Sequence, residues 1–200
     1  PRDAAAWCNS TGNQLISKET AGGKSVVVIE KGEPKSCNIV TSCEGKGKTF
    51  IMFSDDLDKA LATFVLANGA AATGQKVTIF FTFWGLNVIK KLHKPNVEKD
   101  IFGKMFGMML PSSSRKLKLS KMSIGGIGGK MMRYIMNRKG IDSLESLRQQ
   151  ALENGVEFIA CQMSMDVMGV KQEELLDEVT IGGVATYMER ADNANINLFI

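Results

Sequence analysis

Histidine is almost absent from this sequence, and other residues that commonly build catalytic or metal sites are sparse. The 200 residues include one histidine, four cysteines, two tryptophans and two tyrosines. The lone histidine, His93, cannot supply a site with several imidazole ligands, and Cys37 and Cys43 flank five residues, a spacing that matches no common zinc pattern. We therefore expect no metal site, and a nucleophile that is activated without a histidine base.

Long apolar runs are lacking as well. The longest, Val77 to Leu86, has the length of a buried strand and not of a membrane-spanning helix. No signal-peptide pattern is present, and the start at Pro1 without a methionine predicts a processed or cut chain. The cysteines are too few for a disulfide framework, which favours a reducing cytoplasm. The mild net charge of +4 predicts no nucleic-acid partner.

Nucleotide-binding motifs fail on spacing. The run GGIGGK has Ile124 where a phosphate-binding loop needs glycine, and Met131 where it needs Ser or Thr. The dinucleotide pattern fails too, because the run does not directly follow a strand. We expect no cofactor.

The first 31 residues form a short unit of their own. The pattern predicts a helix over Asp3 to Leu15 and then two strands around Gly22 and Gly23, a hairpin. Residues 32–48 are rich in Gly, Ser, Lys and Pro without periodicity, which indicates a linker.

Residues 49–200 alternate between strand and helix patterns. Apolar runs predict strands at TFIMFS, QKVTIFFTF, VEFIACQ and NINLFI, and helices are predicted at DLDKALATFVLANGAAA with Ser54 as N-cap, SLESLRQQALENG, KQEELLDEV and GGVATYMERADN. Strands that read as continuous apolar runs and are separated by helices are typical of a parallel sheet covered on both faces. The predicted fold class is therefore α/β, a three-layer sandwich of flavodoxin-like or Rossmann-like kind, preceded by a partial α+β segment.

A methionine-rich insertion, about residues 100–138, interrupts this alternation. Between Asn87 and Lys139 lie seven of the twelve methionines. Because methionine fills irregular gaps, one interpretation is a loosely packed helical excursion over the sheet. The other is a mobile cover or partner-docking surface, with SIGGIGG as its hinge. The apolar stretch Ile101 to Pro111 would suit a contact with another subunit or with a membrane surface.

Cys161 stands out among the cysteines because it ends the predicted strand VEFIAC. Reactive groups in open α/β sheets gather at the carboxyl ends of the strands. Backbone N–H groups of the turn QMSMDVMG, a helix N-terminus or nearby lysines would favour the thiolate there without a histidine. A buried structural cysteine is the alternative interpretation. Cys37 and Cys43 are secondary candidates, as thiols of the linker.

Four motifs in this order resemble the DsrE/DsrF-like sulfur-relay family, in its larger, methionine-rich branch. They are TFWGLNVIKK, KLKLSKMSIGGIGGKMM, FIACQMSMDVMGV and GGVATYMERADNANINLFI, and the resemblance covers Thr49 to Ile200. Residues 2–31 resemble the second half of a TusA/SirA-like domain, without the half that bears that family's CPxP cysteine. Similar proteins place rhodanese and disulfide reductase modules ahead of these two domains.

The resemblance implies a sulfur carrier or sulfurtransferase that holds sulfur as a persulfide on Cys161. It also implies sulfur donor and acceptor proteins as partners, namely rhodanese-like, TusA-like and disulfide reductase modules, and a homo-oligomer. Candidates for the walls of the site are Met163, Met165, Asp166, Trp84 and Tyr187. The alternative is a non-catalytic module that binds a partner or a ligand such as coenzyme A at the methionine-rich surface.

Overall fold

The computed structural model describes residues 14–21, 24–30, 47–93, 95, 97, 101–121 and 127–200. The chain divides into two compact units, Pro1–Glu44 and Gly45–Ile200. In the first unit, β1 (Gln14–Ala21) pairs antiparallel with β2 (Lys24–Glu30), as the hairpin prediction required. Most of the helix predicted before it lies outside the described residues, but its last two positions, Gln14 and Leu15, belong to β1.

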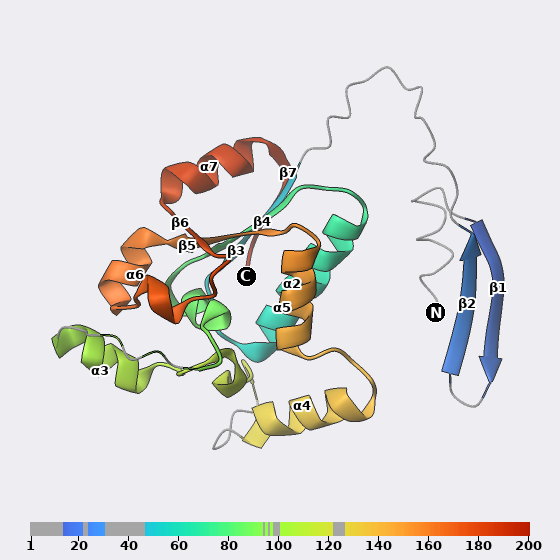
Figure 1. Cartoon of the computed structure of the whole chain (residues 1–200), viewed down its shortest axis with the longest axis horizontal. Coiled ribbons are helices and arrows are strands. Elements are labelled where there is room, and N and C mark those ends of the chain that lie inside the picture. Colours follow the sequence, from blue (N-terminus) through green and yellow to red (C-terminus); the bar gives the residue numbers. More distant parts are fainter. Residues whose placement is uncertain are drawn as a thin grey trace. The chain divides into compact units, whose positions relative to one another are not determined.

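The second unit is built on a five-stranded parallel sheet (Figure 1). The strand order is β6-β5-β4-β3-β7, and the strands are β3 (Gly47–Met52), β4 (Val77–Phe81), β5 (Glu157–Cys161), β6 (Thr180–Gly182) and β7 (Ala194–Phe199). Each neighbouring pair is parallel, so all five carboxyl ends lie at one edge of the sheet. Successive side chains of a strand point to opposite faces.

The main core lies on one face of this sheet, beneath α2 (Leu57–Ala72) and α5 (Leu144–Glu153). Three buried aromatic rings form its centre: the Phe81 and Phe158 centroids are 5.3 Å apart, and those of Phe64 and Phe158 are 5.7 Å apart. Each such aromatic contact contributes about 1 kcal/mol beyond the burial of apolar area.

The opposite face is covered by α7 (Val184–Asp192). Its smaller apolar cluster consists of Phe80, Ile159, Cys161 and Tyr187, with Ile51 and Ala191 packed against it. Figure 1 shows α7 on one side of the sheet and α2 with α5 on the other. The predicted α/β three-layer sandwich is therefore confirmed, with a sheet that is wholly parallel.

The methionine-rich insertion is helical and joins the main core. It follows η1 (Phe83–Ile89) and contains α3 (Ile101–Met109), η2 (Ser114–Lys116) and α4 (Ile127–Arg138). Leu110, Leu117 and Leu119 are buried in the main core, and Met132 packs against it. None of the described helices is long and apolar enough to cross a membrane.

The proposed glycine hinge is wrong at the positions that the structure describes. Gly128 and Gly129 lie buried in the first turn of α4. A Cβ added at Gly129 would stand 3.1 Å from the carbonyl oxygen of Leu117, so close helix packing explains this glycine. The other residues of SIGGIGG, apart from Ile127 at the start of α4, lie outside the described residues.

Two predicted boundaries differ from those in the structure. Asp56, and not Ser54, is the N-cap of α2, while the Ser54 hydroxyl accepts a hydrogen bond from the Asp56 N–H at 3.1 Å. β4 ends at Phe81 and not at Phe83, because Phe83 has φ +47° and begins η1.

The helix predicted at KQEELLDEV is wrong. Only a short 3-10 turn, η4 (Gln172–Glu174), forms there, because the neighbouring backbone bonds to the end of η1: the Lys91 N–H donates to the Glu174 carbonyl at 2.8 Å, and the Leu176 N–H donates to the Ile89 carbonyl at 3.1 Å. The edge strand β6, which follows, was not predicted.

Gly85 fixes the close approach of η1 to the end of β3. Its N–H donates to the carbonyl of Phe53 at 2.8 Å, and a Cβ at this position would lie 1.9 Å from the Met52 carbonyl oxygen. We expect Gly85→Ala to lower the free energy of unfolding by about 2–3 kcal/mol, since backbone must shift to relieve the overlap. Urea denaturation measures this change.

Gly69→Ala is the matched control, because a Cβ at Gly69 meets nothing within 4 Å in the interior of α2. Alanine is a better helix former than glycine, so this variant should be more stable by up to about 1 kcal/mol. Equal effects of the two substitutions would show that the contact between η1 and β3 is not tight.

Candidate functional site

Cys161 is the last residue of β5, at the carboxyl edge of the sheet. It is also the N-cap residue of α6 (Gln162–Met168), a two-turn helix where the sequence predicted a turn. Its neighbour across the sheet is Gly182 of β6. The structure therefore places Cys161 at the carboxyl end of a strand, as the sequence predicted.

The Cys161 side chain is buried on the α7 face, with 2% of its surface exposed. It is a free thiol that packs with Phe80, Ile159 and Tyr187. The Phe80 and Tyr187 rings are 5.2 Å apart, and the Tyr187 hydroxyl lies 3.3 Å from Thr49 Oγ1, which anchors the tyrosine over the sheet. None of the described residues is hydrogen-bonded to Sγ. The thiol environment is therefore apolar and shielded from water.

A glycine allows α7 to lie close over this thiol. A Cβ at Gly182 would stand 2.8 Å from Ile159 Cγ2 and 3.3 Å from the Thr186 side chain. The cover itself is slight, because β6 has three residues and α7 has nine, and Val184 and Met188 on α7 are exposed. Short elements at a sheet edge open at lower free energy than a central core does.

Two buried hydroxyls beside Cys161 escaped the sequence analysis. Thr82 follows β4 at the level of Cys161, since Phe81 pairs with Ala160 one step earlier. Its Oγ1 is hydrogen-bonded to Oγ of Ser164 on α6 at 2.8 Å, and both side chains are buried. This bond fixes α6 to the end of β4. Isolated Thr and Ser residues carry no pattern that would reveal such a pair.

An aromatic row at the same edge was also missed. The Phe53 ring lies 5.4 Å from that of Phe83 and 5.7 Å from that of Phe199, whose side chain is 69% exposed. Phe83 has φ +47°, a strained conformation for a residue with a side chain. The carboxyl ends of β3, β4 and β7 thus present an apolar surface.

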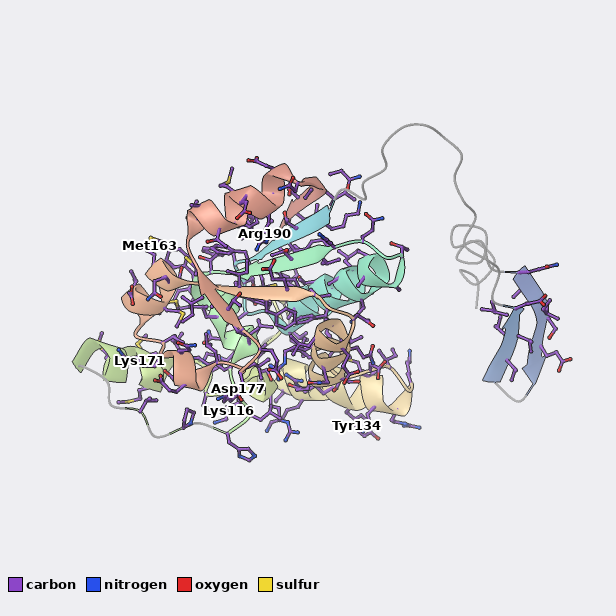
Figure 2. All side chains as sticks on the ribbon, turned by 45° about the horizontal axis from the view of Figure 1, so that its top comes forward. Lys116, Tyr134, Met163, Lys171, Asp177 and Arg190 are labelled. Atoms are coloured by element: carbon purple, nitrogen blue, oxygen red, sulfur yellow. The ribbon has the colours of Figure 1, made fainter. Side chains whose placement is uncertain are left out.

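The residues predicted as walls of the site are dispersed. Tyr187 does pack with Cys161. Met165 is buried in the main core, in a different cluster from that of the thiol. Met163 is 54% exposed on α6, and Trp84 is 42% exposed on η1 (Figure 2 labels Met163). Cys37 and Cys43 lie outside the described residues. Of the five predicted wall residues, only Tyr187 belongs to the cluster around the thiol.

Asp166 lines a surface pocket of about 400 Å³ that does not include Cys161. The other lining residues include Gln162, Met165, Lys171 and Glu173. Asp166 accepts a hydrogen bond from the Gln162 side chain at 3.0 Å. It does not cap α6: the helix ends at Gly169, which has φ +60°.

A half-buried carboxyl lies after β3 at the carboxyl edge. Asp55 accepts a hydrogen bond from Asn87 Nδ2 at 2.9 Å, and burial raises the pKa of Asp55 above its usual 3.8. Asn87 Oδ1 is buried without a hydrogen-bond partner among the described residues. These groups belong to the packing of η1 against β3. Within the described part of the chain, no group of three or more His, Cys, Asp and Glu residues is arranged to hold a metal ion.

The model of the DsrE/DsrF/DrsH-like family matches residues 45–199. The chain belongs to this family. Among its relatives is the uncharacterized protein YrkE of Bacillus subtilis, which is 44% identical over 155 residues, 78% of this chain and 97% of YrkE. The sulfur carrier protein DsrE2 of Allochromatium vinosum is 38% identical over 161 residues, 78% of this chain and 99% of DsrE2.

Two solved structures resemble the DsrE-like unit more distantly. The ychN protein from E. coli aligns with a TM-score of 0.44 and 10% identity, over 77% of this chain and 99% of ychN. MTH1491 from Methanobacterium thermoautotrophicum, a protein of unknown function, aligns with a TM-score of 0.41 and 13% identity, over 76% of this chain and 96% of MTH1491. The family match begins at residue 45, so it does not extend to the hairpin unit, and the TusA/SirA-like assignment of that unit remains a prediction.

An ion pair between α7 and β5 holds α7 against the sheet. Arg190 donates to both carboxylate oxygens of Glu157, at 2.9 and 3.1 Å, and Thr78 Oγ1 adds a third bond at 2.9 Å. These bonds hold the pKa of Glu157 below its usual 4.5, and the hydrogen bonding from Arg190 has the largest effect. The ionised carboxylate therefore stabilises the folded state above about pH 4.5, and this contribution is lost as the pH falls through the lowered pKa.

We expect Glu157→Gln to lower the free energy of unfolding at neutral pH by about 1 kcal/mol or less, because the pair is partly exposed to solvent. The difference from the wild type should vanish well below pH 4. Urea denaturation across this pH range measures both effects. Asp177→Asn, which breaks an exposed pair with Lys91, serves as the control and should change little at any pH. A Glu157→Gln effect that persists in acid would contradict the role of its charge.

Tyr187 is expected to limit access to the thiol. Replacing a buried aromatic side chain by alanine costs about 3 kcal/mol, and part of this cost falls on the opening of the α7 cover. We expect Tyr187→Ala to raise the rate of Cys161 alkylation by iodoacetamide by at least about tenfold, a factor equal to 1.4 kcal/mol. Peptide mass mapping identifies the labelled residue.

Val184→Ala is the matched control on the same helix, since Val184 is 61% exposed. It should leave the alkylation rate of Cys161 unchanged. An unchanged rate in a folded Tyr187→Ala variant would show that α7 does not control access to the thiol.

Proposed function

We propose that this protein is an intracellular sulfur carrier that holds sulfane sulfur as a persulfide on Cys161. Membership of the DsrE/DsrF/DrsH-like family and 38% identity to a protein described as a sulfur carrier support a role in sulfur relay. The observation that carries the assignment to Cys161 is its position: a free thiol at the carboxyl end of an interior parallel strand. Reactive groups gather at this edge in open α/β sheets.

The chemistry is thiol exchange in two steps. The Cys161 thiolate attacks the outer sulfur of a donor persulfide; a new S–S bond forms on Cys161, the donor S–S bond breaks, and the donor leaves as a thiolate. An acceptor thiolate then attacks the outer sulfur on Cys161, takes it as its own persulfide and releases the Cys161 thiolate. Electrons balance within each step, so no external oxidant or reductant is required, and a thiolate that is already populated needs no general base.

Burial of the thiol has two consequences for such a carrier. The apolar surroundings formed by Phe80, Ile159 and Tyr187 keep water and oxidants from a stored persulfide. Transfer, in contrast, needs a partner sulfur to reach Sγ, which is 2% exposed. The thin cover of β6 and α7 is the segment we propose to open during transfer, because it packs on the thiol from the edge side of the sheet.

The partners we propose are sulfur donor and acceptor proteins in the cytoplasm, of rhodanese-like, TusA-like or disulfide reductase type. The antiparallel hairpin β1–β2 is compatible with the closing hairpin of a TusA/SirA-like domain in the first unit. A homo-oligomer is proposed as well. The exposed apolar residues Ile196, Leu198 and Phe199 on edge strand β7 support a contact between subunits.

Intact-mass spectrometry after incubation with polysulfide tests the carrier site. We expect the wild type to gain the mass of one sulfur atom, removable by a reducing thiol, and Cys161→Ser to gain none. Cys161→Ala is a second variant that keeps the buried site apolar, so loss of sulfur loading cannot be ascribed to a buried hydroxyl. Thermal unfolding shows that both variants are folded.

The matched control is the double variant Cys37→Ser with Cys43→Ser, which should load sulfur as the wild type does. Sulfur loading that survives in folded Cys161→Ala and is lost in this double variant would move the carrier site to the predicted linker. Loading in none of the proteins, the wild type included, would favour a non-catalytic binding module.

A further inference from the structure

The segment from residue 101 to residue 141 contains no acidic residue. It carries nine lysines and arginines, and since the whole chain has a net charge of +4, the remaining residues carry a net −5. The net positive charge of this protein is thus concentrated in this segment, which includes α3, η2, α4 and the residues between and after them. Among the described residues of this segment, Arg115, Lys116, Lys118 and Lys121 are exposed.

Helix α4 presents an unburied apolar stripe within this charge. Ile127, Met131, Tyr134 and Ile135 are spaced as one face of a helix, and they are 67%, 45%, 63% and 38% exposed. The inner face is held by the buried Gly128, Gly129 and Met136. Beside the apolar stripe stand the exposed cations Lys130, Arg138 and Lys139. Such a basic amphipathic helix is typical of one that lies on a membrane surface.

Helix α3 adds a second apolar group to the same segment. Met105, Met108 and Met109 are 50%, 85% and 78% exposed. Methionine side chains are unbranched and flexible, so they insert into an irregular apolar medium at little cost. We call the exposed residues that the structure describes between Met105 and Lys139 the basic surface.

The α4 part of the basic surface lies away from the candidate thiol. Met132 of α4 and Leu110, Leu117 and Leu119 pack with the main core, whereas Cys161 belongs to the cluster beneath α7. Figure 1 shows α4 and α7 on opposite sides of the sheet, and Figure 2 shows Tyr134 on α4 far from Arg190 on α7. Helix α4 therefore does not cover Cys161, and a contact at α4 leaves the α7 side of the sheet free.

We propose that the basic surface binds an anionic lipid membrane as a peripheral contact. The cations meet anionic headgroups, and the side chains of Ile127, Met131 and Tyr134 enter the interface between headgroups and acyl chains. An acidic protein or a nucleic acid would satisfy the cations but would not require seven exposed apolar side chains among them. Because α7 lies on the other side of the sheet, the membrane-bound protein keeps its thiol face open to soluble partners.

Co-sedimentation of the full chain with vesicles tests this proposal. We expect binding to vesicles of phosphatidylcholine with phosphatidylglycerol, weakening as salt is added, and at least tenfold weaker binding to phosphatidylcholine alone. Each cation near an anionic surface contributes about fivefold to the binding constant. Lys130→Gln with Arg138→Gln and Lys139→Gln should therefore lower binding by at least about tenfold.

A second variant, Ile127→Ser with Met131→Ser, keeps every charge and should also weaken binding. Val65→Ser with Leu66→Ser is the matched control: these side chains are 57% and 47% exposed on α2, and binding should be unchanged. Equal binding to both kinds of vesicle overturns the proposal, and so does retention by polyglutamate or RNA without binding to anionic vesicles. Cys161→Ala should bind vesicles as the wild type does, which separates this proposal from the carrier function.

Discussion

The register of β5 between its two neighbours is the constraint on which the functional part of this structure depends. Hydrogen bonding along β4 pairs Phe81 with Ala160, and β6 pairs Gly182 with Cys161. Since side chains alternate between faces, this register places Phe158 and Ala160 in the main core and Ile159 and Cys161 beneath α7. A slip of one residue would exchange the two sets, burying the thiol in the main core and turning a core phenylalanine toward the thin cover.

The two faces of the sheet carry apolar clusters of unequal size, and Cys161 lies in the smaller one. One face packs against α2, α5 and the leucines of the insertion, with Phe64, Phe81 and Phe158 in ring contact. The other face carries α7, held by Tyr187 and by the ion pair between Arg190 and Glu157. The proposed opening of the second face does not involve the contacts of the main core, so the proposed carrier would exchange sulfur without global unfolding.

The structure shows which residues of the methionine-rich insertion are buried and which are exposed, a division that its composition did not predict. Its inner residues complete the main core, and its outer residues form the basic surface. A contact on that side and sulfur exchange beneath α7 do not compete for the same residues. The proposed membrane contact and the proposed carrier chemistry are therefore compatible within one DsrE-like unit.

The sequence by itself predicted the α/β class, the hairpin, most of the strands and helices, and Cys161 as the residue at a functional edge. These follow from local signals: apolar runs of strand length, helical periodicity and the end of a strand. Local signals do not predict contacts between residues that lie far apart in the sequence.

Contacts between distant segments decided the rest. The backbone near Glu174 bonds to η1 and so forms no long helix, and Thr82 finds Ser164 at a separation of 82 residues. Met165 and Cys161 are four residues apart and yet lie in different apolar clusters. The sequence determined that a thiol would stand at the carboxyl edge. Only the packing of α7 over the sheet decided that Tyr187 would cover it, because burial depends on which segments meet in space.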